Sequence, residues 1–542
     1  MDTTITAPGL QQQIEMLTAR ITEMSAQITE LLAHNSKLQT LNEYYASQLL
    51  LLKRRQFGAS SEKTIIYTDE YRQMNLFNEA EAEADKALPE PELEEITYSR
   101  KKRVGKREED LSGLPVERID HELPEEERHC PACDKIMRDI GVDIRRSLKL
   151  IPAQVVVVED ATHTYACENC QENADHTPII KAEAPAALLA GSLASPSLVA
   201  HIAHQKYSNG MPLYRLEKGF TFDGVNISRQ TMANWVIKCV EIYLISIYLL
   251  LQTFLLKESA LHADETTVQV LREPGRPAQS KSYEWVYRTS GYSEHKIVIY
   301  EYQETREQEH PIKFLKDFKG FLHTDGYQVY HGLPPDIIIV GCWAHARRKW
   351  ENLLKTIPKD KRKGSDAERG LMFINRLFDF EREFRKLTPE QRYIKRLEKS
   401  EPVADAFFAW ALSLGALPKS PLGEAANYAL SQRKYLENVF LDGRLELSNN
   451  RCERSVKPFV MGRKNWLFSN TPNGAQASSI MYSIIETAKE NGLHPYQYVK
   501  FLLETLPNSK TDQLEALLPW SPSLPDCCRV PVKIAQGASG KR

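Results

Sequence analysis

The sequence predicts a multidomain α+β protein, and three observations support this prediction. The length of 542 residues is enough for several domains at about 150 residues per domain. Two C-x2-C motifs fall within residues 113–180, where they indicate a small metal-binding ribbon. The remaining chain changes from helical patterns, at residues 9–55 and 185–250, to short β-rich runs within residues 255–500. We therefore expect a coiled coil, a ribbon, a helical domain and an α/β core, in that order.

Composition limits the possible partners and compartments. The 70 Lys and Arg residues nearly balance 72 Asp and Glu residues, so a surface for nucleic acid must be local. The N-terminal MDTTITAPGL lacks a basic region followed by an apolar core, so we expect no secretory signal and a cytoplasmic protein. The apolar run Ile242–Leu256 is shorter than the roughly 20 residues of a membrane helix. A buried helix explains it better than a membrane span, and we expect no membrane partner.

Residues 9–55 show the apolar spacing of a coiled coil, with steps of four and three. When Leu10 is placed at position d, isoleucines fall at a and leucines at d: Ile14, Ile21, Ile28, Leu17 and Leu31. Isoleucine at a with leucine at d favours a parallel dimer. The segment therefore predicts a homo-oligomer; the alternative is an intramolecular helical hairpin.

Residues 56–112 have the composition of a linker. An acidic stretch is followed by a basic one, Arg100–Arg107, and such charge blocks cannot bury a core. The basic half could contact DNA phosphates, but a plain solvated linker is an equally good explanation.

Four of the nine cysteines form two metal-binding knuckles, HCPAC and CENC. Each C-x2-C pair can place two thiolates on one tetrahedral ion, and two pairs complete a site for structural Zn2+. The predicted ligands are Cys130, Cys133, Cys167 and Cys170. Four thiolates leave no position for a substrate, so catalytic zinc is not expected. The resulting zinc ribbon could present a surface to DNA or to protein.

Residues 185–250 predict a helix-turn-helix. Two helical segments precede the turn FDGVN, and a third, ISRQTMANWV, begins after Ser228 as its N-cap. Arg229 and Gln230 fall in the first exposed turn, where a recognition helix contacts base edges in the major groove. Arg can pair with guanine and Gln with adenine. The alternative is a small helical bundle in which both side chains are only solvated.

Three carboxylates occur in contexts that allow them to converge. Asp264 lies near the middle of a predicted strand, LHADETTVQVL, and Asp325 lies at the end of another, GFLHTDGYQVY. Glu453 follows Ser448, Asn449 and Asn450, which mark the start of a helix. Two aspartates on neighbouring strands and a glutamate on a following helix can meet at one point. Taken singly, each of them would be a surface or capping carboxylate.

Such a cluster suits phosphoryl transfer. Two Mg2+ (or Mn2+) ions about 3.5–4 Å apart can activate a nucleophile and stabilise a leaving oxygen, and carboxylates are suitable ligands for them. Basic and aromatic residues near Glu453 suit phosphates and an unstacked base: Arg454, Lys457, Arg463, Lys464 and Trp466. In CWAHARRKW, the predicted phosphate contacts are Arg347, Arg348 and Lys349, although this motif could also be a packed turn.

These motifs together resemble the insertion sequence 66 family of transposases. The matching text includes HADET, TDGY, CWAHARRKW, NNRCERSVKPFVMGRKNWLFSN and SRQTMANW, spread over about residues 10–505. The resemblance implies a ribonuclease H-like catalytic core at 255–500 with a helical insertion at 351–440. It also implies an acidic triad of Asp264, Asp325 and Glu453. The zinc ribbon and helix-turn-helix would bind the element's terminal inverted repeats, with target DNA and small accessory proteins as further partners.

Two positions depart from the family pattern. Ser448 stands where the family usually has Asp, and Asp134 stands where it usually has Gly. If the family's Asp only caps the helix, Ser replaces it well; if it helps to position metal, activity is in question. Residues 501–542 form a C-terminal element and tail, which we expect to be loose from the Pro-rich stretch at Pro519 onward.

The sequence thus predicts an enzyme that cleaves and joins DNA. Two other functions stay open. A DNA-binding regulator would need only the coiled coil, the ribbon and the helix-turn-helix. A nuclease or resolvase would use the same core to cut without joining.

Overall fold

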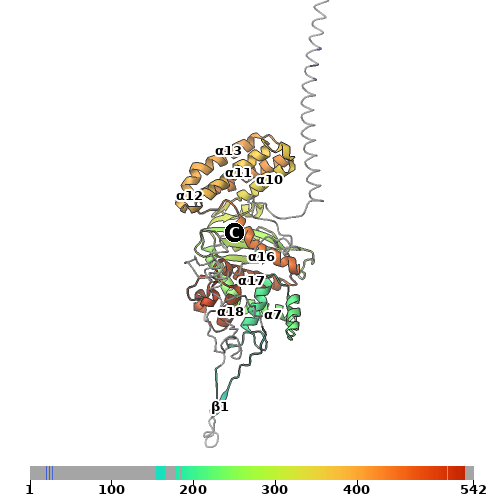
Figure 1. Ribbon diagram of the computed structural model, residues 1–542, viewed down its shortest axis with the longest axis vertical. Coiled ribbons are helices and arrows are strands. Elements are labelled where there is room, and N and C mark those ends of the chain that lie inside the picture. Colours follow the sequence, from blue (N-terminus) through green and yellow to red (C-terminus); the bar gives the residue numbers. More distant parts are fainter. Residues whose placement is uncertain are drawn as a thin grey trace, which may run out of the picture.

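The computed structural model describes residues 154–166, 179–183, 186–509 and 511–530, with Arg20, Met24 and Gln27 as isolated residues. Within these ranges the chain is a mixed α+β protein (Figure 1). The linker and all but those three residues of the predicted coiled coil lie outside the described residues. The same holds for the four predicted zinc ligands: Cys130, Cys133, Cys167 and Cys170.

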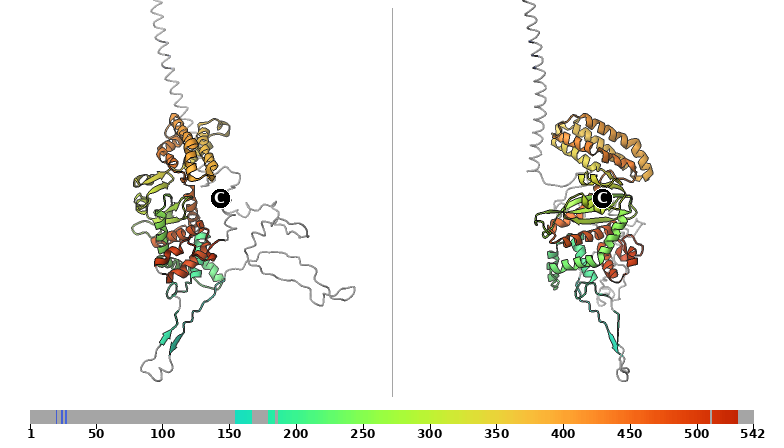
Figure 2. Two further views of the ribbon diagram at one scale, coloured as in Figure 1. Left: turned by 90° about the vertical axis from the view of Figure 1, so that its left-hand side faces the viewer. Right: turned by 180° about the vertical axis from the view of Figure 1, so that it is seen from behind.

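A short hairpin projects from the body of the molecule. Its strands β1 (Thr164–Ala166) and β2 (Ile179–Lys181) are antiparallel, with Tyr165 opposite Ile180. Figures 1 and 2 show it extending away from the helices and the larger sheet. β1 ends immediately before Cys167 in the chain, so the hairpin lies within the predicted zinc ribbon.

A group of helices follows the hairpin. Helix α5 (Pro196–Ala203) continues as the π-helix η2 (His204–Ser208), and α6 (Leu213–Phe222) comes next. Helix α7 (Arg229–Cys239) then continues through the π-helix η3 (Val240–Leu244) into α8 (Ile245–Leu256). The side chains of Ser195 and Ser228 accept hydrogen bonds from Leu198 N and Thr231 N, so both act as N-caps. Gly224, at φ 80°, forms the turn before α7, as its place in FDGVN predicts.

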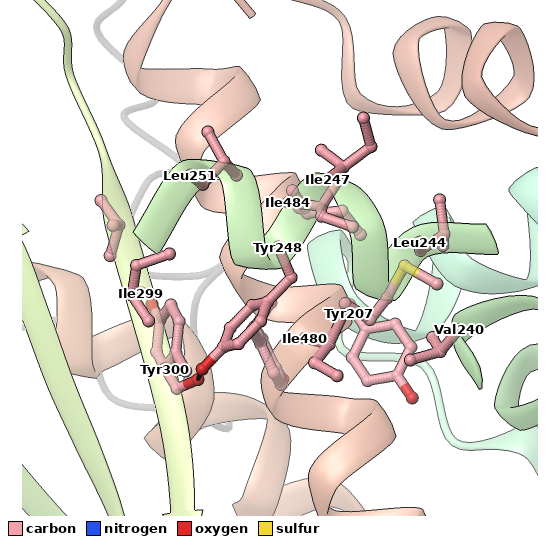
Figure 3. Packing of buried hydrophobic residues seen from close by; sticks show 14 of the residues in the cluster. Tyr207, Val240, Leu244, Ile247, Tyr248, Leu251, Ile299, Tyr300, Ile480 and Ile484 are labelled. Atoms are coloured by element: carbon pink, nitrogen blue, oxygen red, sulfur yellow. Dashed lines mark hydrogen bonds between the residues drawn. The ribbon is translucent and has the colours of Figure 1, made fainter. Parts of the chain in front are cut away.

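The helix from Arg229 to Leu256 is long and apolar enough to span a membrane by length and composition alone. Apart from Ile242 and Leu249, which are exposed, its large apolar side chains are at least partly buried in the protein. Figure 3 shows Leu244, Ile247, Tyr248 and Leu251 packed against side chains of the sheet and a C-terminal helix: Ile299, Tyr300, Ile480 and Ile484. Burial against this core accounts for the apolar run that the sequence analysis assigned to a buried helix.

A five-stranded sheet forms the centre of the molecule: β3 (Ala260–Gln269), β4 (Lys281–Thr289), β5 (Val298–Gln303), β6 (Gly320–His323) and β7 (Ile337–Val340). Its strand order is β5-β4-β3-β6-β7. β4 is antiparallel to both β3 and β5, whereas β6 and β7 run parallel to β3. His262 of β3 is in register with His323 of β6, so the residues that follow each histidine lie side by side.

Helices cover the sheet and satisfy its edge. Helix α17 (Pro472–Glu490) runs along the edge strand β5, where Tyr300 N donates to Ser483 Oγ and Val298 N to Thr487 Oγ1. These bonds satisfy backbone groups that an open sheet edge would leave unpaired. Helix α16 (Asn450–Trp466) contacts β3 and β4, and the short α9 (Glu309–Phe314) and η4 (Gln328–Gly332) lie in the sheet's connections.

The chain between β7 and α16 is helical and has a hydrophobic cluster of its own. That cluster includes Trp343, Trp350 and Phe407. Figure 1 places these helices at the end of the molecule opposite the hairpin. They are α10 (Trp343–Thr356), η5 (Lys359–Lys361), α11 (Asp366–Glu383), η6 (Phe384–Lys386), α12 (Pro389–Lys395), η7 (Arg396–Ser400), α13 (Glu401–Ser413), α14 (Pro421–Ser431), α15 (Arg433–Leu436) and η8 (Glu437–Leu441).

The C-terminal stretch corrects one prediction. After α18 (Pro495–Thr505), the chain forms the 3-10 turns η9 (Leu506–Asn508), η10 (Thr511–Leu517) and η11 (Asp526–Cys528). The stretch from Pro519 to Val530 is packed rather than loose, because Leu524 and Cys528 are buried and Trp520 stacks on His295. Its apolar side chains bind it to the core despite its prolines.

Candidate active site

The structure brings the two predicted aspartates together. Asp264 lies in the middle of the central strand β3, and Asp325 lies two residues beyond the end of β6. Because β3 and β6 are parallel and in register, both aspartates lie at the same position along the strand direction. Carboxylate oxygens of Asp264, Asp325 and Glu265 lie within 4.8 Å of one another.

Glu453 approaches this pair from helix α16. It lies in the first turn of the helix, and its carboxylate forms a second close group with Cys342 Sγ and the His345 ring, also within 4.8 Å. Arg348 Nη2 lies 3.6 Å from Glu453 Oε2, and His345 Nε2 lies 3.7 Å from Oε1. The three predicted carboxylates therefore lie in two separate close groups, and the charge of Glu453 in the second group acts on Asp264 in the first.

The electrostatics of the cluster favour a bound cation. Burial, followed by the charges of Glu265 and Asp325 and finally that of Glu453, raises the pKa of Asp264 well above its usual value. Glu453 Oε1 is buried without a hydrogen-bond partner. Clustered carboxylates, one of them with a buried oxygen that has no hydrogen bond, are the ligands that Mg2+ or Mn2+ takes, so this site fits a divalent metal.

Glu265 has a different role from its neighbour Asp264. Arg306 Nε donates to its Oε1 at 2.9 Å, and the Tyr330 hydroxyl donates to Oε2 at 2.6 Å. Arg306 also lies over the ring of Tyr327, 3.6 Å from its centroid. Because both oxygens already have partners, Glu265 ties the segment after Asp325 to β3 and is less suited than Asp264 to hold an ion.

A buried polar group behind the carboxylates was missed by sequence reasoning. Asn449, the residue before α16, is fully buried; its Nδ2 donates to Ala263 O at 2.8 Å, and its Oδ1 lies 2.9 Å from His262 Nδ1. The His262 ring stacks on that of His323, with centroids 4.3 Å apart. A repeated motif could have revealed this arrangement, because a histidine precedes each aspartate by two residues, in HAD and HTD.

The hydrogen bonds of Asn449 determine the protonation of His262. The carbonyl of Ala263 can only accept, so the amide nitrogen of Asn449 must face it. The amide oxygen then faces His262 Nδ1, which must carry a proton. Burial lowers the pKa of His262 to about 4, so near neutral pH the ring is uncharged and has its proton on Nδ1. This bond fixes the start of α16 to β3, two residues from Asp264.

The position of Ser448 bears on the departure from the family pattern. The N-cap of α16 is Asn449, one residue later, and its side chain makes no capping bond because it bonds to β3 instead. Ser448 therefore does not cap α16 in this structure.

The basic residues predicted near Glu453 lie on two sides of α16. Arg454, Lys457 and Lys464 are exposed, whereas Arg463 donates to Thr266 and Thr267 of β3. Trp466 is half-buried, and Lys206 Nζ lies 3.8 Å from the centroid of its ring. One face of the indole is thus already covered by a cation from η2.

The remaining predicted contacts lie on α10 and α7. Arg347 donates to Asn375 and Glu351 on the helical segment, Arg348 faces Glu453, and Lys349 is exposed. Arg229 and Gln230 are exposed in the first turn of α7, at the far side of the molecule from α10. The structure thus brings Arg348 to the carboxylates and leaves Arg229 and Gln230 on a separate surface.

Comparison with known proteins assigns most of the chain to characterised domain types. Residues 191–477, which are 287 of the 542 residues, match a family model described as "Transposase IS66 family". Residues 483–520 match "IS66 C-terminal element", and residues 127–171 match "zinc-finger binding domain of transposase IS66". Residues 45–119 match "Transposase C of IS166 homeodomain". The zinc-finger match contains all four predicted cysteine ligands.

Similar proteins occur in Sinorhizobium fredii (strain NBRC 101917 / NGR234). The protein named "Uncharacterized protein y4qI" is 29% identical over 522 residues, covering 93% of both chains. "Uncharacterized protein y4jD" is 29% identical over 74% of this chain and 80% of its own length. The first similarity covers nearly the whole chain, and the four domain matches follow one another along the chain without overlap.

Proposed function

The chain belongs to the IS66 family of transposases, and on this premise we propose that it cuts and joins the DNA ends of a bacterial insertion sequence. Asp264, Asp325 and Glu453 are the proposed catalytic carboxylates. The observation that carries the proposal is the close approach of Asp264 and Asp325 from two parallel strands, with Glu453 on α16 near enough for its charge to raise the pKa of Asp264.

The topology supports a ribonuclease H-like core. Three antiparallel strands, β3 to β5, are followed by two parallel strands, β6 and β7, which join the sheet on the other side of β3. The carboxylates then lie on the central strand, after its parallel neighbour and on a helix that packs across the sheet. This is the arrangement that the family resemblance implies, and all three carboxylates are partly exposed.

The carboxylates would hold two Mg2+ or Mn2+ ions. When bound, such ions activate the attacking oxygen and stabilise the leaving oxygen of an in-line phosphoryl transfer. The protein's part is to hold its carboxylates in place before DNA arrives. Asn449 and His262 fix the start of α16, Glu265 and Tyr330 fix the segment after Asp325, and Arg348 orients the Glu453 carboxylate.

The DNA would approach along α16. The exposed cations Arg454, Lys457 and Lys464 are placed to contact phosphates on either side of the scissile bond. We propose that the terminal inverted repeats are read elsewhere, by Arg229 and Gln230 on α7 and by the zinc finger with its structural Zn2+. Self-association through the N-terminal segment would bring two ends together in the cytoplasm.

A strand-cleavage assay tests this function. Linear DNA carrying the sequences that flank the gene is incubated with the protein and Mg2+, and we expect nicks at the element boundary that disappear with a chelator. A DNA-binding regulator would bind the same DNA without cutting it. Pre-cut ends offered with a circular target separate the remaining alternative, since a nuclease or resolvase would not join them. Absence of Mg2+-dependent cutting by zinc-loaded, folded protein would refute the proposal.

A further inference from the structure

The turn after α16 has an unusual backbone. Leu467 has φ 68° and ψ −45°, and the next residue, Phe468, donates its N–H to Trp466 O at 2.9 Å. This i to i+2 bond with a positive φ defines a γ-turn of the strained kind. Among the described residues, Leu467 is the only one other than glycine with a positive φ. A branched side chain there needs the surrounding structure to hold it, and such strain is concentrated at functional sites.

The chain on both sides holds the turn in place. Leu467 N donates to Arg463 O, which closes the last turn of α16. Ser469 N then donates to Gln269 O, and Leu271 N donates to Ser469 O, so the chain after the turn is fixed to the end of β3. The result is that Leu467 and Phe468 stand in solvent, with 65% and 44% of their surfaces exposed. Two neighbouring apolar side chains are thus kept outside the core at the expense of backbone strain.

The exposed face of α16 connects this turn to the carboxylates. Its side chains Arg454, Lys457, Met461 and Lys464 recur at helical spacing and are all exposed. Glu453, at the start of this face, is the only acidic residue in a helix that carries five basic ones. An excess of four positive charges on one helix favours a polyanion along it.

Leu467 and Phe468, rather than Trp466, offer the apolar surface that the sequence suggested for contact with an unstacked base. Lys206 covers one face of that indole, and the edge of Tyr207 approaches it with ring centroids 6.5 Å apart. The exposed apolar surface at this end of the helix consists instead of Leu467 and Phe468.

We propose that Leu467 and Phe468 form a contact surface for the nucleobases of unpaired or unstacked DNA whose phosphates follow the exposed face of α16. The inference rests on the proposed function and specifies where the DNA is distorted. Glu453 and Leu467 are 14 residues apart in sequence, which at about 1.5 Å per residue is roughly 21 Å. At about 3.4 Å per nucleotide, the surface lies about six nucleotides from the scissile phosphate.

Bases fit this surface better than a protein partner does. An apolar protein surface would have to be brought against a helix with a large excess of positive charge. Nucleic acid supplies both components, because phosphates pair with the cations and base faces stack on an aromatic ring. Base faces are accessible only where the duplex is opened, and apolar side chains commonly insert at such steps.

Two probes of equal charge test the contact with the full-length protein. One is an oligothymidylate of about 20 nucleotides, and the other is an abasic phosphodiester chain of the same length. We expect the wild type to bind the oligothymidylate about tenfold more tightly at fixed salt. Leu467→Gly and Phe468→Ser should each reduce this ratio at least threefold. The matched control is Leu412→Ser, which changes an equally exposed leucine on α13.

Leu467→Gly also tests whether misfolding could explain a loss of base preference. Glycine adopts a positive φ without strain, so this variant should melt at the same or a higher temperature than the wild type while losing base preference. An unchanged ratio in both variants, or an equal loss for both probes, would overturn the inference. So would weaker self-association with an unchanged ratio, which would assign the surface to a second copy of the chain. These readouts need no cleavage, so failure of the inference is distinguishable from failure of the proposed function.

Discussion

The two ends of α16 depart in opposite ways from the rule that polar groups stay outside and apolar groups inside. At the N-terminal end, Asn449 is fully buried and bonds to β3. At the C-terminal end, Leu467 and Phe468 are exposed on a strained turn. Both departures flank α16, the helix that carries Glu453. Local conflicts with folding preference are expected where function requires a particular geometry, so the helix is best explained as a support for catalysis at one end and for DNA at the other.

The largest expected effect comes from removing charge at the carboxylates. Asp264→Asn, Asp325→Asn and Glu453→Gln keep the shape of each side chain but remove a proposed metal ligand. Each should lower strand cleavage at least about 1,000-fold, since transition-state charge would lose its stabilisation. Binding of end DNA, measured by gel shift, should change little because the proposed recognition surface on α7 is separate. Wild-type cleavage in any of the three would remove that residue from the proposed site.

The next effect tests the N-terminal end of α16. Asn449→Ala removes two buried hydrogen bonds and should lower stability by about 1–3 kcal/mol. We also expect the rate of DNA cleavage to fall roughly 100-fold, with a higher Mg2+ requirement, because the Glu453 carboxylate would no longer be held in position relative to Asp264.

A matched variant separates positioning from stability. Asn491, at the end of α17, also donates from its side chain to two backbone carbonyls, those of Lys296 and Thr487. Asn491→Ala should therefore lose similar stability in chemical denaturation while keeping cleavage within a few-fold of the wild type. His262→Asn, which retains a donor near the Nδ1 position, should keep more activity than His262→Gln. Equal activity losses at positions 449 and 491 would mean that Asn449 only supports the fold.

A smaller effect should come from the exposed cations between the two ends. Lys457→Ala removes one proposed phosphate contact without a buried partner, so end-DNA affinity should fall a few-fold. The slope of log affinity against log salt concentration should fall by about one. Arg376→Ala on α11 removes a charge far from the proposed path and should leave the slope unchanged. A slope that is also unchanged in Lys457→Ala would place the DNA elsewhere.

The smallest effect concerns stability at the C-terminal end. Leu467→Gly relieves a positive φ and should raise the free energy of unfolding by about 1 kcal/mol, measured by denaturant titration. A loss of stability would show that Leu467 makes packing contacts that outweigh the strain, and the contrast between the two ends would no longer hold.

Sequence patterns predicted the elements that carry the site because they depend on local signals. The strand around Asp264, the glycine turn after Asp325 and the cap at Ser228 all follow from neighbouring residues. Asn449 was placed at the start of the helix, but its bond to His262 joins residues 187 apart in sequence. No local pattern reports such a bond. The γ-turn at Leu467 was missed for a related reason, because leucine gives no signal for positive φ and part of what holds the turn is the long-range pairing of Ser469 with β3.

The C-terminal stretch also shows that local sequence patterns do not reveal contacts with distant residues. Its prolines predicted a loose tail, since proline interrupts regular structure. The structure packs it through Leu524, Cys528 and the stacking of Trp520 on His295. The stacking partner of Trp520 lies 225 residues earlier in the chain, so composition alone could not reveal it.

Metal-directed cleavage of the polypeptide tests the central claim most directly. Fe2+ bound in place of Mg2+, with ascorbate and peroxide, generates radicals that cut the backbone close to the ion. We predict three clusters of cuts, near residues 264, 325 and 453, all suppressed together by excess Mg2+ and all lost in Asp264→Asn. Cuts at only one of these segments, or cuts that Mg2+ does not suppress, would contradict the account.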